Sequence, residues 1–94
     1  MIQFEWDENK NEINKKKYGL SFETATQVFY DDAALVFDDP DHSIEEERFL
    51  IIGSVRSGKI CIVSHCCRGC DERIRIISAR RATNAERHTY LNGI

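Results

Sequence analysis

The feature that most constrains the fold is the stretch 73–82, Arg-Ile-Arg-Ile-Ile-Ser-Ala-Arg-Arg-Ala, in which four arginines stand among β-branched residues. Such an alternating run predicts a two-faced β-strand over residues 73–79. Because strand side chains alternate, the pattern predicts Ile74, Ile76 and Ser78 on one face and Arg73, Arg75, Ile77 and Ala79 on the other.

Arg80 and Arg81 follow where this strand ends and a helix begins. Cations gathered at a strand-to-helix junction suit a phosphate-bearing ligand, because guanidinium groups bind phosphate oxygens in pairs. The alternative is a solvated strand face whose arginines serve solubility. Spacing alone leaves both interpretations open.

The length of 94 residues predicts one domain, 1–94, with a single core. The sequence contains no apolar run near the roughly 20 residues that cross a bilayer, and its N-terminus lacks the basic and apolar regions of a signal peptide. We therefore expect a cytoplasmic protein with no membrane association.

Charge is distributed unevenly along the chain. Residues 1–47 sum to −9 and residues 48–94 to +6, within a net charge of −3. An acidic protein is not expected to bind nucleic acid in bulk, but a basic C-terminal half can present one cationic face to RNA or to an acidic partner. The alternative is that folding mixes the two halves and removes the contrast.

The N-terminal third predicts two helices. Asp7 is a suitable N-cap for a helix through Lys17, whose sparse apolar stripe, from Trp6 and Ile13, implies weak packing. A second, core-facing helix is predicted over residues 21–30, which repeat apolar residues at helical spacing.

The middle of the chain predicts strands. Apolar runs at 33–37, 47–54 and 59–65 are bounded by acidic or glycine-containing segments, with 56–58 as a hairpin turn and 66–72 as a loop into the arginine-rich strand. We therefore expect a four-stranded, mainly antiparallel sheet.

The last segment predicts a helix. Thr83 and Glu86 have the spacing of a capping box that opens a helix through about Leu91. Two N-terminal helices, a four-stranded sheet and a C-terminal helix together define an α+β domain.

Three of the four cysteines crowd into one short segment with a histidine: His65, Cys66, Cys67 and Cys70. Such residues are zinc's usual ligands, but structural zinc normally takes two ligand pairs from separate elements, and adjacent cysteines do not converge easily. We therefore predict free thiols, no metal site and no cofactor, with a small metal or redox protein as a minor alternative.

A second group of residues suits ribonuclease chemistry: His65, Arg68, Arg75, Arg80 and Tyr90. Cleavage of RNA by its own 2′-hydroxyl needs a base, cations for the pentavalent phosphate and an acid, and these side chains supply all three without metal. The alternatives are that His65 is a hydrogen-bonded strand-edge histidine and that Tyr90 only packs.

Many short motifs, in order and spacing, resemble the BrnT-type toxins of type II toxin–antitoxin pairs. They are Phe4-Glu5-Trp6-Asp7, Lys17 before Gly19, Ser21-Phe22-Glu23, Val28-Phe29, His42-Ser43, Glu47-Arg48, Ile52-Gly53 and Ile74-Arg75-Ile76-Ile77-Ser78-Ala79-Arg80, followed by Ala82, Glu86 and Tyr90.

This resemblance implies a RelE-like ribonuclease fold and RNA cleavage that arrests translation. It also implies neutralisation by a BrnA-type antitoxin with a ribbon-helix-helix domain, and contact with promoter DNA only through that antitoxin.

The resemblance also implies site residues. His65 and Arg68 resemble a His and Arg three apart, Arg80 matches the arginine of the Ile-Ser-Ala-Arg motif, and Tyr90 matches a C-terminal tyrosine. The family's usual Lys-His-Gly is Lys17-Tyr18-Gly19 in this sequence.

The sequence as a whole therefore predicts a metal-independent endoribonuclease toxin. Its predicted catalytic residues are His65, Arg68, Arg75, Arg80 and Tyr90, and its predicted RNA contacts are Lys17 and Arg48. The alternative is a catalytically inactive binding module that acts only with the antitoxin in promoter autoregulation.

Overall fold

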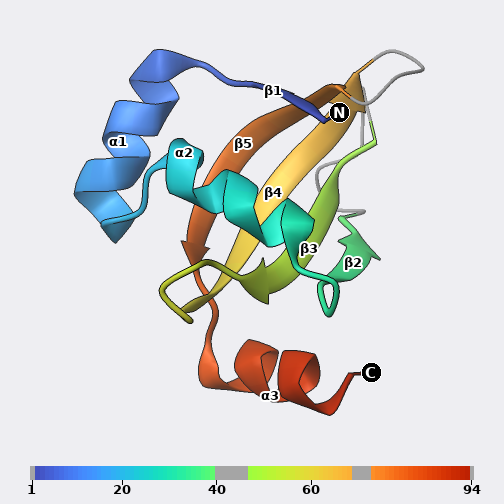
Figure 1. Cartoon of the computed structure of the whole chain (residues 1–94). Coiled ribbons are helices and arrows are strands. Elements are labelled where there is room, and N and C mark those ends of the chain that lie inside the picture. Colours follow the sequence, from blue (N-terminus) through green and yellow to red (C-terminus); the bar gives the residue numbers. More distant parts are fainter. Residues whose placement is uncertain (1, 40–46, 69–72, 94) are drawn as a thin grey trace.

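The computed structural model describes residues 2–39, 47–68 and 73–93, which form an α+β structure around one five-stranded sheet with strand order β1-β5-β4-β3-β2 (Figure 1). The strands are β1 (Gln3–Glu5), β2 (Leu35–Asp38), β3 (Phe49–Ser54), β4 (Ile60–Arg68) and β5 (Arg73–Arg81). The helices are α1 (Glu8–Tyr18), α2 (Phe22–Ala25), the 3-10 helix η1 (Thr26–Tyr30) and α3 (Asn84–Asn92). None of the helices in these residues is long and apolar enough to span a membrane.

The predicted four-stranded sheet is wrong by one strand. The N-terminal segment Gln3–Glu5 adds β1, which runs parallel to the start of β5, while the other four strands pair antiparallel. Three residues are too few to show a period, so only the long-range contact reveals this strand. Phe4 holds it in place, because its ring packs 5.3 Å from the ring of Phe29.

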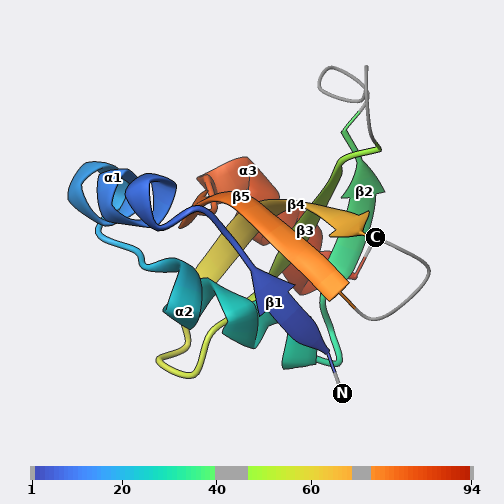
Figure 2. The same cartoon turned by 90° about the horizontal axis from the view of Figure 1, so that it is seen from above.

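The hydrophobic core lies between α2, η1 and one face of the sheet. Its centre is formed by side chains that are fully or almost fully buried: Phe22, Ala25, Val28, Ile51, Val63, Ile76 and Ala79. Figure 2 shows α2 and η1 along this face and α1 beside the β5 edge. In Figure 1, α3 lies apart from the other helices, near the end of the sheet where β5 finishes. It has no buried residue.

Helix α1 is attached mainly by polar side chains. Of the predicted apolar stripe, Trp6, which precedes the helix, packs against the core, but Ile13 does not. Ile13 is 62% exposed, whereas Asn14 is buried. The Asn14 amide donates to the carbonyl of Ala79 at 2.7 Å and accepts from the Ala79 N–H at 3.2 Å. The Asn14 side chain thus makes with the Ala79 backbone the two hydrogen bonds that a neighbouring strand would make at this open edge of β5.

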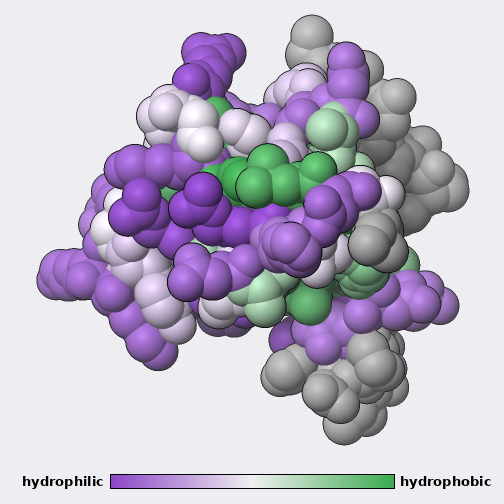
Figure 3. All heavy atoms as spheres, turned by 90° about the horizontal axis from the view of Figure 1, so that it is seen from below, coloured by the Kyte–Doolittle hydropathy of each residue, from purple (hydrophilic) through white to green (hydrophobic). Residues whose placement is uncertain are grey.

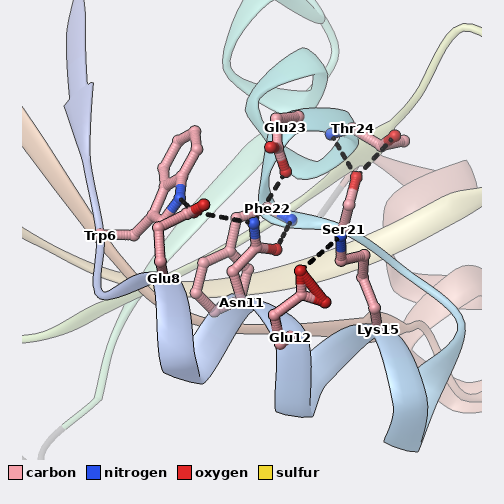
Figure 4. Close-up of polar contacts among 9 residues, drawn as sticks. All are labelled: Trp6, Glu8, Asn11, Glu12, Lys15, Ser21, Phe22, Glu23 and Thr24. Carbon is pink, nitrogen blue, oxygen red and sulfur yellow. Dashed lines mark hydrogen bonds and ion pairs between the residues drawn. The ribbon is translucent and has the colours of Figure 1, made fainter.

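Asn11 makes the second polar attachment of α1, shown in Figure 4. Its Oδ1 accepts from the backbone N–H of Phe22 at 2.9 Å, and its amide donates to the carboxylates of Glu23 and Glu8. Three hydrogen bonds thus satisfy the amide oxygen and both amide hydrogens of this buried side chain, and they fix α2 against α1.

The two faces of β5 are divided differently from the prediction. The pairing of β4 with β5 shifts register between Ser64 and His65, which leaves Ile77 without a partner. A bulge of this kind adds one residue and reverses the alternation that follows it. Ala79 therefore lies in the core with Ile76, and the face assignment predicted for the residues after Ile77 was wrong.

Two strands are longer than predicted. β4 continues to Arg68, so Cys66 and Cys67 belong to a strand and not to a loop, and β5 continues to Arg81. The remainder of the predicted loop, residues 69–72, lies outside the described residues. Local predictions at the helix ends are confirmed, since Asp7, Ser21 and Thr83 each cap the helix that follows.

Candidate functional site

His65 lies in the aromatic part of the core. It is 4% exposed, and its ring stands edge-on to Phe29 at 4.9 Å and tilted to Phe49 at 5.9 Å between ring centroids. Burial lowers the pKa of His65 from its usual 6.5, although the Val63 carbonyl beside Nδ1 opposes this effect. The imidazole is therefore neutral near pH 7 and enclosed by apolar rings.

The neighbouring cysteines do not converge with this histidine. Successive strand residues point to opposite faces, so Cys66 lies on the other face of β4 from His65. Cys61 and Cys67 are free thiols, Cys66 is buried, and Cys70 lies outside the described residues. Among the described residues, no group of three or more His, Cys, Asp or Glu side chains converges on a possible metal position.

Arg75 lies on the face of the sheet away from α2. Its Nη1 donates to Oε2 of Glu5 on β1 at 3.1 Å, and Arg73 makes a longer ion pair of 3.7 Å with the same carboxylate. β1 therefore places an acid between these two cations. Arg68 ends β4 opposite Arg73 in the register, and its side chain lies outside what the structure describes.

Arg80 is bound to the first turn of α3. Its two terminal nitrogens donate to the two carboxylate oxygens of Glu86 at 2.8 and 2.9 Å. The Arg80 hydrogen bond lowers the pKa of Glu86 and the same contact raises the pKa of Arg80. Glu86 also accepts from the N–H of Thr83, so one carboxylate joins the strand to the helix cap.

Tyr90 makes the other attachment of α3. Its hydroxyl donates to Oδ2 of Asp31 at 2.6 Å, and the same oxygen accepts from the N–H of Ser54 at 2.7 Å. The Asp31 hydrogen bond raises the pKa of Tyr90 to about 12. Burial alone would raise the pKa of Asp31, but the hydrogen bonds that it accepts lower it below 3.8.

The predicted site residues whose side chains the structure describes lie at different places on the sheet and the helices. Arg75 and Arg80 are five positions apart on β5, which corresponds to roughly 16 Å. Arg48 directly precedes β3, at the same end of the sheet as Arg75. Lys17 is in the last turn of α1, and its Nζ lies 5.2 Å from the ring centroid of Tyr18.

Sequence reasoning missed a cationic surface at the β5 end of the sheet. Two adjacent cavities of about 590 and 530 Å³ share the lining residues Ser57, Lys59 and Arg81. Their lining residues come from the turn between β3 and β4, the end of α1, the end of β5 and the start of α3, which Figure 1 shows toward the same end of the sheet. We call this surface the cationic groove and define it by Lys15, Tyr18, Ser57, Lys59, Arg81 and Arg87.

One residue of this groove could be found from the sequence, because the cations predicted at the strand-to-helix junction included Arg81. Lys59 and Arg87 could not be joined to it, since they come from a turn and a helix whose positions depend on the tertiary structure. Figure 3, which views the side on which α3 lies, shows mainly hydrophilic residues around a narrow hydrophobic strip. The fold and its surfaces thus define a small α+β protein with cationic side chains around two adjacent cavities at one end of its sheet.

Comparison with protein families then gives the particular class. Residues 6–86 match the model of the family described as "Ribonuclease toxin, BrnT, of type II toxin-antitoxin system". The chain belongs to this BrnT family of ribonuclease toxins.

A solved structure agrees with the family match. The crystal structure of the Brucella abortus ribonuclease toxin BrnT is similar to this chain with a TM-score of 0.67 and 27% sequence identity. The match covers 89% of this chain and 100% of the Brucella chain. No curated protein matches.

Proposed function

We propose that this protein is a metal-independent endoribonuclease toxin that cleaves RNA, inhibits translation and acts in the cytoplasm. The observation that carries the proposal is the family match over residues 6–86. The arginine-rich strand β5 supports it, because cations are the groups that a phosphoryl-transfer site needs most. We also propose that the fold is RelE-like.

In this proposal, arginines neutralise the phosphate while other groups transfer the protons. Arg68, Arg75 and Arg80 are the proposed phosphate ligands, and His65 or Tyr90 handles the proton of the attacking 2′-hydroxyl or of the leaving oxygen. Three of these groups must be released before they act. Arg75 is bound by Glu5, Arg80 by Glu86 and the Tyr90 hydroxyl by Asp31.

The accessibility of His65 is a separate requirement. Its 4% exposure means that RNA reaches the imidazole only if the surrounding aromatic side chains move. Lys17 and Arg48 are proposed as further RNA contacts from two ends of the sheet, where they would position the strand and not the scissile phosphate.

The proposed partner is a BrnA-type antitoxin with a ribbon-helix-helix domain. A type II antitoxin is a protein that neutralises its toxin by binding it, and opposite charge favours its contact with cationic surfaces. Promoter DNA is proposed to be contacted only through this antitoxin, since the chain has a net charge of −3.

A second candidate function is an inactive binding module that acts with the antitoxin in promoter autoregulation. One observation favours it: Arg80 and Tyr90 both serve to attach α3, and His65 is enclosed in the core. Residues with complete structural roles do not by themselves indicate catalysis.

Expression without the antitoxin separates the two functions. For the ribonuclease we expect growth arrest with cleaved RNA, and cleavage by the purified protein that persists in EDTA. Arg75→Gln, which leaves the α3 attachments intact, is expected to fold and to lose cleavage. Folded, soluble protein that neither arrests growth nor cleaves RNA would favour the binding module.

A further inference from the structure

The cationic groove is built from four elements of the fold, which come from three separate parts of the sequence. Lys15 and Tyr18 come from the last turns of α1, Lys59 from the connection before β4, and Arg81 from the end of β5. Arg87 from the second turn of α3 closes the other side. The groove is thus a product of the fold and not of one basic segment.

The charge of the groove is not balanced by acids. No Asp or Glu among the described residues lines either of its two cavities. Lys15 pairs with Glu12 at 3.2 Å, outside the lining. In the described part of the chain, the side chains of Lys59, Arg81 and Arg87 have no acidic partner.

Two other arginines of β5, unlike Arg81, have acidic partners. Arg75 is paired with Glu5 and Arg80 with Glu86, so each would have to exchange a carboxylate for a phosphate. In the described part of the chain, Lys59, Arg81 and Arg87 of the cationic groove have no carboxylate to displace before they bind an anion. Cys61 lies buried beside them, and burial raises the pKa of its thiol despite the nearby Arg81 and Lys59.

The groove also offers an aromatic surface. Tyr18 is 40% exposed at one end of the groove, and the Nζ of Lys17 lies 5.2 Å from its ring centroid. Basic side chains beside an exposed aromatic ring are the two parts that single-stranded nucleic acid requires, because phosphates meet the cations and a base stacks on the ring. An acidic protein segment would not require the ring.

We propose that the cationic groove binds the backbone of single-stranded RNA, with phosphates at Lys59, Arg81 and Arg87 and a base stacked on Tyr18. This inference rests on the proposed ribonuclease function and gives it a substrate-binding surface outside the predicted catalytic residues. Because the contacts are to phosphates, the groove positions RNA with little preference for sequence.

The test measures binding separately from cleavage. The probe is a short, fluorescently labelled 2′-O-methyl RNA of mixed sequence, which lacks the attacking hydroxyl and cannot be cleaved by internal attack. Affinity is measured over a series of salt concentrations. The double variant Arg81→Gln/Arg87→Gln is compared with Lys10→Gln/Lys16→Gln, which removes the same charge from exposed positions of α1 outside the groove lining.

We expect the groove double variant to bind at least about tenfold more weakly and to lose about 1.4 from the slope of log affinity against log salt, since each single-strand phosphate contact contributes roughly 0.7. The control double variant should change both quantities much less. Tyr18→Ala should weaken binding about fivefold or more while Tyr18→Phe retains it, because stacking needs only the ring.

Equal effects of the groove and control variants would overturn the proposal, because net charge alone would then explain binding. Normal RNA binding with loss of antitoxin binding would also overturn it and identify a protein interface. If the double variant fails to fold, Lys59→Gln on the exposed turn replaces it. A wild-type protein that binds through the groove but does not cleave would count against the proposed catalysis and not against the groove.

Discussion

We expect the hydrogen-bonded ion pair between Arg80 and Glu86 to attach α3 to the rest of the protein. This helix buries none of its residues, so specific polar contacts must replace packing. The perturbation is the pair of substitutions Arg80→Gln and Glu86→Gln, made singly and together. Glutamine at position 86 retains the capping box, because its amide oxygen still accepts from the Thr83 N–H.

The magnitude follows from geometry and exposure. Two charged hydrogen bonds of 2.8 and 2.9 Å join the side chains, which are 40% and 24% exposed. A fully exposed pair contributes at most about 1 kcal/mol, whereas hydrogen bonds to charged groups away from water contribute about 1.5–3 kcal/mol. We therefore expect a coupling of about 1.5 kcal/mol between the two substitutions.

The assay is thermal or urea unfolding of all four proteins. With a coupling of about 1.5 kcal/mol, the Tm of the double variant should fall by roughly 6–12 °C less than the sum of the two single-variant decreases, for a domain of this size. Because Arg80 lowers the pKa of Glu86 below 4.5, this stability is present above that pH and is lost as the pH falls through the lowered value. The coupling should therefore weaken progressively as the pH falls below 4.5.

The control is Thr83→Ala, which removes the cap side chain that accepts from the Glu86 N–H. It should cost about 1 kcal/mol and show little coupling to Arg80→Gln. Coupling below about 0.3 kcal/mol between Arg80 and Glu86 would refute the reasoning, because additivity within that limit is typical of independent sites. If Arg80 also binds the scissile phosphate, Glu86→Gln should retain cleavage and Arg80→Gln should lose it.

Further predictions follow from single contacts. Tyr90→Phe removes the hydrogen bond to a carboxylate and should lower stability by about 1 kcal/mol, measured by urea unfolding, with faster hydrogen exchange confined to α3. Asn14→Ala leaves backbone groups of β5 unpaired and should cost about 2–4 kcal/mol, whereas the exposed neighbour Ile13→Ala should cost much less. Because the pKa of His65 is lowered, stability should fall as the pH drops below about 6.5, by up to about 1.4 kcal/mol per pH unit, and His65→Phe should remove this dependence. Gly53→Ala should destabilise by about 1–3 kcal/mol, since its new Cβ would lie 3.0 Å from a core side chain.

Local physics made the helix ends predictable. Asp7 and Thr83 could be identified as N-caps because capping needs only a short side chain and the next two or three backbone N–H groups. Gly19 and Gly93 end α1 and α3 with positive φ, a backbone conformation that other residues adopt with strain. Alternation likewise predicted β5, and bounded apolar runs predicted β2, β3 and β4.

The candidate site was predicted less well, because residue type does not determine orientation. Arg75 and Arg80 were expected to face one ligand, but their positions on β5 lie roughly 16 Å apart and each meets its own carboxylate. His65 was placed correctly on a central strand, yet only the packing of Phe29 and Phe49 decides that it is enclosed.

The sequence by itself thus determined the class of fold, the residues that cap the helices and the family, whereas the helix expected over residues 21–30 is the short helix α2 followed by the 3-10 helix η1. The tertiary structure alone decided the parallel strand β1, the bulge at Ile77, the bond between Tyr90 and Asp31, and the meeting of Lys59, Arg81 and Arg87 in one groove. The physical reason is distance along the chain. Periodicity and capping reflect energies between near neighbours, whereas these contacts join segments whose relative position is fixed only when the whole core is packed.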